Sequence, residues 1–210
     1  MNHRHSARIF ATAALACAGY IVSPPVHAGG DAVETLVMVR HGEKPENGLG
    51  QLTCQGLNRA LALPRVIEAK YGRPDAIYAP NPAKQKNDRG IKYDYVRPLA
   101  TIEPTAVYFG LPVNASIGFK NTDQLIDALV SPRYQNSLVV VAWEHTVVEA
   151  VARRIVARYG GDASSVPRWD GADYDSIYVV RIAQHDGSPV VSFSAAHEGL
   201  NDLPTTCPTH

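Results

Sequence analysis

The stretch from Val37 to Pro45 limits what this chain can fold into, because an apolar run ends there abruptly in an arginine, a histidine and a glycine. Such a run predicts a buried parallel strand, and ligands of open α/β sheets bind outside the carboxyl ends of those strands. Arg40 and His41 are therefore expected where a ligand arrives. Gly42 has no Cβ, so it is expected to let the backbone turn sharply and an anion approach closely.

The side chains at this strand end suit a phosphoryl group. A guanidinium such as that of Arg40 pairs with two oxygens, while a ring nitrogen of His41 can attack phosphorus. A second run, from Ser137 to Trp143, is rich in β-branched residues and is typical of a strand buried on both faces. It too ends in polar residues, Glu144 and His145. Two buried strands that each deliver a histidine indicate one shared site.

Arg97 supplies a second guanidinium. It precedes a helical pattern, so its side chain and the free amides of the first turn can face the same anion. Pro98 suits that first turn. Pro104 lies further along and predicts that the helix starts nearer Glu103 or is broken there.

The other elements follow from local patterns. Apolar residues at helical spacing predict a helix from an N-cap at Thr53 to Tyr71, with a kink or a division at Pro64. Residues 76–79 predict a short strand, and the polar run 81–92 predicts a solvated loop, with a role in gripping the substrate as the alternative.

Three further elements are expected in the second half of the chain. The run from Asn121 to Leu129 predicts a short amphipathic helix, and Thr146 is expected to cap a helix from Val147 to Tyr159. Residues 176–182 and 190–193 predict a hairpin or a pair of edge strands.

The first 28 residues have the pattern of a secretory signal peptide. Arg4 and Arg8 form a basic beginning, an apolar and alanine-rich stretch follows, and a small-residue cleavage site ends at Ala28. The apolar stretch is too short and too broken for a membrane span. The protein is therefore expected to be periplasmic or secreted, with no membrane span in the mature chain.

The mature chain, residues 29–210, is expected to form a single domain. It carries 18 Lys and Arg residues against 20 Asp and Glu residues, so no overall basic surface points to nucleic acid or to an anionic membrane. Its two cysteines, Cys54 and Cys207, predict a disulfide bridge in an oxidising compartment, with two free thiols as the alternative.

The sequence resembles the histidine phosphatase superfamily, which includes the phosphoglycerate mutases. The resemblance rests on Arg40-His41-Gly42-Glu43 after a strand, on Gly48-Leu49-Gly50-Gln51-Leu52-Thr53 with Gly56 in the first helix, on Arg97, and on His145 after a Val-rich strand. It implies a three-layer α/β/α sandwich with a mainly parallel sheet. The short segment between Ala79 and Arg97 leaves little room for an extra helical domain, so no large cap domain is expected. The resemblance also implies a histidine-type phosphatase that hydrolyses phosphomonoesters.

The resemblance implies roles for individual residues. His41 is the nucleophile that becomes phosphorylated, Arg40, Arg97 and His145 form the phosphate pocket, and Lys44 is a weaker candidate for it. The partner implied is a small phosphorylated substrate, with no cofactor and no metal. The chain departs from the family pattern where a tryptophan and a glutamate precede His145, because small residues are common there.

The chemistry of such a site adds expectations. His41 must attack as a neutral imidazole, so its second ring nitrogen is expected to donate a hydrogen bond to a backbone carbonyl. Arg40 and Arg97 are expected to lower the pKa of His41 and, with a protonated His145, to stabilise the charge that develops on the phosphoryl oxygens.

Two questions stay open from the sequence. The proton donor to the leaving group is Glu144 if its strand has already ended at Trp143, or Asp123, or no residue at all. Two other classes of function are alternatives. One is a non-catalytic module that binds phosphate esters on the same fold, and the other is a metal-dependent hydrolase, although no pair of residues has the helical spacing of zinc ligands.

Overall fold

A computed structural model describes residues 32–208 of the chain. The expected signal peptide, residues 1–28, lies outside the described residues. Among residues 32–208, no helix combines the length and the apolar character that crossing a membrane requires.

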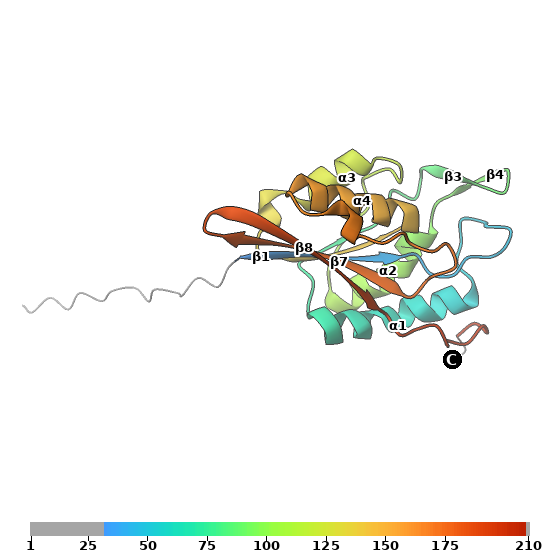
Figure 1. The fold of residues 1–210 in the computed structure, drawn as a ribbon. Helices are drawn as coiled ribbons and strands as arrows, with labels where there is room; N and C mark the ends of the chain where they lie inside the picture. The colour runs from blue at the N-terminus through green and yellow to red at the C-terminus, as the bar shows by residue number, and fades with distance from the viewer. Residues whose placement is uncertain (1–31, 209–210) are drawn as a thin grey trace, which may run out of the picture. The chain divides into compact units, whose positions relative to one another are not determined.

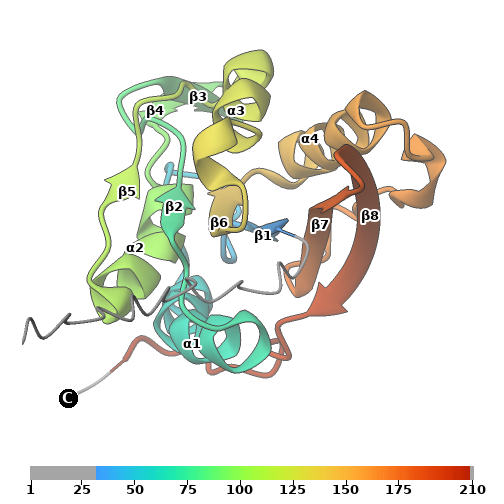
Figure 2. The ribbon, with the colours of Figure 1, turned by 90° about the vertical axis from the view of Figure 1, so that its left-hand side faces the viewer.

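A six-stranded sheet forms the middle layer (Figure 1). Its strands follow the order β5-β2-β6-β1-β7-β8 (Figure 2). β5, β2, β6 and β1 are parallel neighbours, whereas β7 pairs antiparallel with both β1 and β8. The expectation of a mainly parallel sheet is confirmed. The strands are β1 (Val33–Arg40), β2 (Ala76–Tyr78), β5 (Val113–Asn114), β6 (Leu138–Trp143), β7 (Ser176–His185) and β8 (Ser188–His197).

Helices cover both faces of this sheet, with α1 and α2 on one side and α3 and α4 on the other (Figure 2). Val37 and Val39 of β1 pack toward α1 and α2, while Leu36 and Met38 pack toward α3 and α4. Both faces of β1 are thus buried, which explains its continuous apolar sequence. The helices are α1 (Cys54–Tyr71), α2 (Arg97–Phe109), α3 (Thr122–Leu129) and α4 (His145–Arg158), with short 3-10 turns at Pro132–Tyr134 and Ala163–Ser165.

The helix expected after Thr53 is confirmed as α1, and the Thr53 hydroxyl accepts a hydrogen bond from the Gly56 amide. α1 is a single helix that continues through Pro64, so it is not divided there. α2 begins at Arg97 and continues through Pro104, so the expected start near Glu103, or a break there, is wrong. The apolar face of α2 is buried against the sheet, and this packing outweighs a local cost of about 3 kcal/mol for an internal proline.

The polar run 81–92 is mostly exposed, as expected, but it is not an irregular loop, because its second half enters a hairpin of β3 (Gln85–Asp88) and β4 (Ile91–Asp94). The two turn residues, Arg89 and Gly90, both have positive φ angles, of 52° and 91°. This geometry matches the right-handed twist of paired strands, and glycine adopts it without strain. The segment therefore folds as a ribbon with an inner and an outer face.

α4 begins at His145, two residues earlier than expected. Glu144 is its N-cap residue, so the expected cap at Thr146 is wrong. The reason is that β6 ends at Trp143 and the chain turns into the helix at once, which places His145 in the first turn. The expected hairpin of β7 and β8 is confirmed, with a two-residue turn.

The predicted bridge between Cys54 and Cys207 is confirmed. It joins the first residue of α1 to the C-terminal tail, which also lies along α1 through hydrogen bonds from the Asn58 side chain to the carbonyls of Pro204 and Thr206. The tail has no regular structure of its own, so these contacts with α1 set its path.

Candidate active site

Two parallel strand ends bring the predicted histidines to one edge of the sheet. In the register of β1 with β6, Arg40 is opposite Trp143. The His41 amide donates a hydrogen bond to the Trp143 carbonyl at 2.9 Å. The residues that follow each strand, His41 on one side and Glu144 and His145 on the other, are therefore neighbours.

His41 is buried, and its ring is held in one tautomer. Nδ1 lies 2.8 Å from the Gly42 carbonyl oxygen. Because a carbonyl only accepts, Nδ1 carries the proton and Nε2 keeps a free lone pair. The expected hydrogen bond to a backbone carbonyl is confirmed.

Burial lowers the pKa of His41 well below its usual value of 6.5, and the charges of Arg97 and Arg40 lower it further. The hydrogen bond to Gly42 opposes these effects without outweighing them. The imidazole is therefore neutral near pH 7, which is the form that a nucleophile requires.

Arg40 is fixed from two sides. Its Nη1 donates to the carbonyls of Gly171 and Asp173, at 2.8 and 2.7 Å. The Tyr174 ring lies against the guanidinium, with 3.8 Å from its centroid to Cζ. The buried Nε atom has no hydrogen-bond partner. A rigid guanidinium with an unsatisfied donor is suited to an incoming anion.

Arg97, the first residue of α2, is also buried and also has an unpartnered Nε atom. Its Nη2 forms an ion pair with Asp88 on the inner face of the hairpin. Its Cζ lies 5.3 Å from the centre of the Tyr95 ring. The second guanidinium is thus held in place by a carboxylate that the sequence did not single out.

His145 and Glu144 complete the cluster of side chains at this edge of the sheet, which also contains Arg40, His41 and Arg97. Nδ1 of His145 is buried without a hydrogen-bond partner, 3.5 Å from Oε1 of Glu144. Burial and the charge of Arg40 lower the pKa of His145, against the opposing effect of Glu144. The His145 ring is therefore neutral near pH 7, and its expected protonated form beside a phosphoryl group stays a prediction. A bound dianion would favour the protonated form.

The predicted proton donors differ in where they lie. Glu144 is past the end of β6 and its carboxylate lies 3.7 Å from the ammonium of Lys86, on the cluster side. Asp123 is exposed and forms an ion pair with Arg154 of α4. That pairing directs Asp123 to the α3 and α4 surface, so the Asp123 alternative has no support from the structure.

Lys44 is exposed at the rim of the cluster. Partial burial lowers its pKa, and the charges of Arg97 and Arg40 lower it further. Its ammonium thus lies within electrostatic reach of both predicted phosphate-binding arginines, in agreement with a peripheral contribution.

Four residues of the cluster were missed from the sequence. They come from the hairpin, from the residue after it and from the loop before β7: Lys86, Asp88, Tyr95 and Tyr174. Alternation along β3 turns Lys86 and Asp88 to the same face. The sequence signal that could have revealed Lys86 and Asp88 is the Asp88-Arg89-Gly90 turn between two extended segments.

The role of Gly42 is different from the expected one. A Cβ on Gly42 would lie 2.9 Å from the Gly56 carbonyl oxygen of α1. The Gly42 amide donates to the Thr101 hydroxyl, so it is not available to an anion. Glycine is required here because two backbones pack closely, and this contact holds the residue next to His41 against α1.

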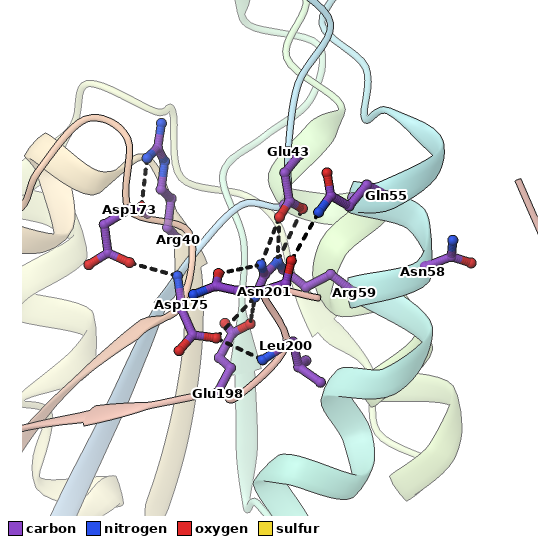
Figure 3. A network of polar contacts seen from close by, with 12 residues as sticks. Arg40, Glu43, Gln55, Asn58, Arg59, Asp173, Asp175, Glu198, Leu200 and Asn201 are labelled. Carbon is purple, nitrogen blue, oxygen red and sulfur yellow. Dashed lines mark hydrogen bonds and ion pairs between the residues drawn. The ribbon is translucent and has the colours of Figure 1, made fainter. Parts of the chain in front are cut away.

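Beneath the cluster, Arg59 of α1 joins the loop after β1 to the C-terminal tail (Figure 3). Its guanidinium contacts Glu43 at 2.7 Å and Glu198 at 2.6 Å, and it donates to the Asn201 side chain. Asp175 lies 3.6 Å away. Arg59 and Glu198 are fully buried, and burial raises the pKa of Glu198 to about 8 even though Arg59 opposes this shift. The buried contacts fix Glu43, two residues after His41.

Among the described residues, no group of three His, Cys, Asp or Glu side chains is arranged to hold a metal ion. Glu43, one of the metal-ligand residue types near His41, is engaged by Arg59 instead.

Comparison with known proteins places the fold. No protein-family model matches the chain, and no curated protein matches it in sequence. A structure from Nakamurella multipartitia, assigned as the phosphohistidine phosphatase SixA, matches with a TM-score of 0.54 at 15% identity, over 79% of this chain and 96% of that one. Phosphoglycerate mutase from Plasmodium falciparum matches with a TM-score of 0.51 at 14% identity, over 85% and 99%.

These two likenesses confirm the phosphoglycerate mutase-like fold that the resemblance to the histidine phosphatase superfamily implied. At such low sequence identities the two matches are evidence for the fold alone, so the chemistry of this chain has to be argued from its own residues.

Proposed function

We propose that this protein is an exported phosphomonoester hydrolase that works through a phosphohistidine on His41. The observation that carries the proposal is the state of the His41 ring, which is neutral, buried and hydrogen-bonded through Nδ1 to Gly42. Its free Nε2 belongs to the same cluster as Arg40 and Arg97, whose Nε atoms are buried and unpartnered. Export rests on the signal-peptide pattern alone.

The proposed reaction has two displacements. Nε2 of His41 attacks phosphorus, the bond to the ester oxygen breaks, and the alcohol leaves with a proton. Water then attacks the phosphohistidine, which releases inorganic phosphate and restores the neutral ring. Arg40 and Arg97 bind the phosphoryl oxygens throughout, and preorganised charges of this kind usually supply the largest catalytic contribution.

Glu144 is the proposed proton donor to the leaving alcohol. Support for this role is its position past the strand end, between Lys86 and His145. His145 lies beside Glu144 and, once a dianion is bound near Arg40, gains a proton that stabilises the phosphoryl group. Lys44 at the rim adds a further positive charge.

The proposal is tested with p-nitrophenyl phosphate. Wild type is expected to hydrolyse it and to form an acid-labile, base-stable phosphoprotein on rapid quenching, whereas His41→Ala loses several orders of magnitude in kcat and forms no phosphoprotein. Lys44→Ala is expected to lose much less. Equal rates for wild type and His41→Ala would favour the non-catalytic phosphate-ester binding module. Loss of activity after exhaustive chelation, restored by added metal, would favour a metal-dependent hydrolase.

A further inference from the structure

A groove of about 370 Å³ opens at the same edge of the sheet as the cluster. Its walls come from the segments that follow β2 and β5, which a hydrogen bond from the Asn81 amide to the Ile117 carbonyl ties together. Since these strands are parallel to β1 and β6, their ends lie on the side where His41 emerges. The lining residues are Lys84, Gln85, Gly118, Phe119, Lys120 and Asn121.

Ring contacts link this groove to the nucleophile. The Tyr95 ring lies 6.2 Å from the His41 ring and 5.3 Å from the Phe119 ring, measured between centroids. The ammonium of Lys86 lies over both Tyr95 and Phe119, at 4.9 and 6.0 Å from their centres. The groove is therefore separated from the nucleophile by the packed rings of Tyr95 and Phe119, and a substrate whose phosphate is at His41 reaches the groove only with an alcohol portion long enough to cross them.

The inner wall of the groove is anchored. The Phe119 carbonyl accepts a hydrogen bond of 2.9 Å from the indole nitrogen of Trp143, the last residue of β6. Trp143 is buried in the core. Phe119 is thus fixed to the same strand end that delivers Glu144 and His145.

The charged side chains that line the groove are all positive. Lys84 and Lys120 are exposed, and no Asp or Glu of the described chain lies within ion-pair distance of either ammonium. No acidic residue lines the groove, whose remaining polar side chains are the amides of Gln85 and Asn121. Lys86, between the groove and His41, already pairs with Glu144. Two unpaired cations beside an anion site favour a ligand with a second negative charge.

We propose that the groove binds a second anionic group of the substrate, so that the preferred substrates are phosphomonoesters whose alcohol portion itself bears a phosphate or a carboxylate. This inference rests on the proposed function, because it places the first phosphate at His41. Lys84 and Lys120 pair with the distal anion, and Phe119 contacts the carbon chain between the two charged ends.

The test compares two ester series of increasing chain length, alkanediol bisphosphates and alkyl monophosphates with the same number of carbons. At one chain length or more, kcat/KM is expected to be about tenfold higher for the bisphosphate, since two exposed ion pairs together supply roughly 1.4 kcal/mol. The preference is expected to shrink in high salt. The same comparison with carboxyalkyl phosphates shows whether a carboxylate serves as well as a phosphate.

The variant Lys84→Gln/Lys120→Gln is expected to lose this preference and to keep the wild-type rate on p-nitrophenyl phosphate. Lys70→Gln, on α1 beside a different cavity, serves as the matched control and is expected to keep the preference. Equal kcat/KM for both series at every length, or a double variant that keeps the preference, would overturn the inference. If no ester is hydrolysed at all, the proposed function fails, and calorimetry then tests the groove separately: equal Kd values for each matched pair overturn it.

Discussion

The guanidinium of Arg97 and the carboxylate of Asp88 form a buried ion pair across the cluster. The pair joins the first residue of α2 to the inner face of the β3 and β4 hairpin. Because an arginine that binds phosphate needs its donors, the carboxylate and an incoming phosphate compete for the same group. The hairpin thereby holds Arg97 in position while the site is empty.

Removal of that competition is expected to tighten anion binding. In Asp88→Asn, the inhibition constant of inorganic phosphate is expected to fall by about tenfold or less, while the phosphate-free protein loses roughly 1 to 3 kcal/mol of stability because a buried charge is left without its partner. Phosphate titrations and urea unfolding with and without phosphate check both effects. Asp94→Asn, an exposed carboxylate of the same hairpin, is the control. Unchanged phosphate inhibition would contradict the competition.

The proposed role of Glu144 as proton donor is tested by comparing esters whose leaving groups differ in their need for a proton. Glu144→Gln keeps the shape of the side chain but cannot donate a proton in the same way, so kcat for alkyl phosphates is expected to fall by about 10² or more. The fall is expected to be much smaller for p-nitrophenyl phosphate, whose alcohol leaves readily without a proton. Glu46→Gln, in the exposed loop after β1, is the control. A uniform loss on all esters would assign Glu144 a positioning role instead.

The pH dependence follows from His41. Burial, followed by Arg97 and Arg40, lowers its pKa well below 6.5, and only the neutral ring attacks. The acid limb of kcat/KM, corrected for titration of the ester, is therefore expected to lie below pH 6.5, with full activity retained at that pH. A midpoint of the acid limb at or above pH 6.5 would show that burial and the two arginines do not lower the pKa of His41.

The buried Glu198 is expected to make the free energy of unfolding fall as the pH rises. Burial raises its pKa to about 8 in the folded chain, from 4.5 in the unfolded chain. Its contribution is therefore present below pH 4.5 and is lost as the pH rises through about 8. Between pH 5 and pH 8.5, wild type is expected to lose roughly 4 kcal/mol relative to Glu198→Gln, since the pKa rises from 4.5 to about 8 on folding and one pKa unit corresponds to about 1.4 kcal/mol. Urea unfolding at both pH values measures the difference, and a constant difference would refute the assignment.

The bridge between Cys54 and Cys207 closes a loop with a sequence separation of 153 residues. By the chain-entropy argument, replacing both cysteines with alanine is expected to cost about 3 to 5 kcal/mol of unfolding free energy. Urea unfolding of the double variant beside the oxidised wild type provides the measurement, with reduced wild type expected to resemble the variant. If all three unfold at the same urea concentration, the bridge does not stabilise the domain.

Local patterns were enough to predict the central strands and the cap of α1. β1 and β6 have apolar residues on both faces, and only a strand covered on two sides buries such a run. The Thr53 side chain caps α1 through a hydrogen bond to the first turn of that helix, so this role could be predicted from the local sequence without knowledge of distant residues. His41 and His145 could be placed at one edge because the carboxyl ends of parallel strands meet there.

The tertiary structure decided everything that depends on distant neighbours. α2 continues through Pro104 because the sheet buries its apolar face, an energy that the local pattern does not contain. Asp88 and Arg59 look like ordinary surface residues in the sequence. One is buried beside Arg97 and the other below Glu43, because segments far apart in the chain close over them. The protonation states of His41 and His145 are set in the same way, since desolvation acts on a charge only when the whole fold has excluded water from it.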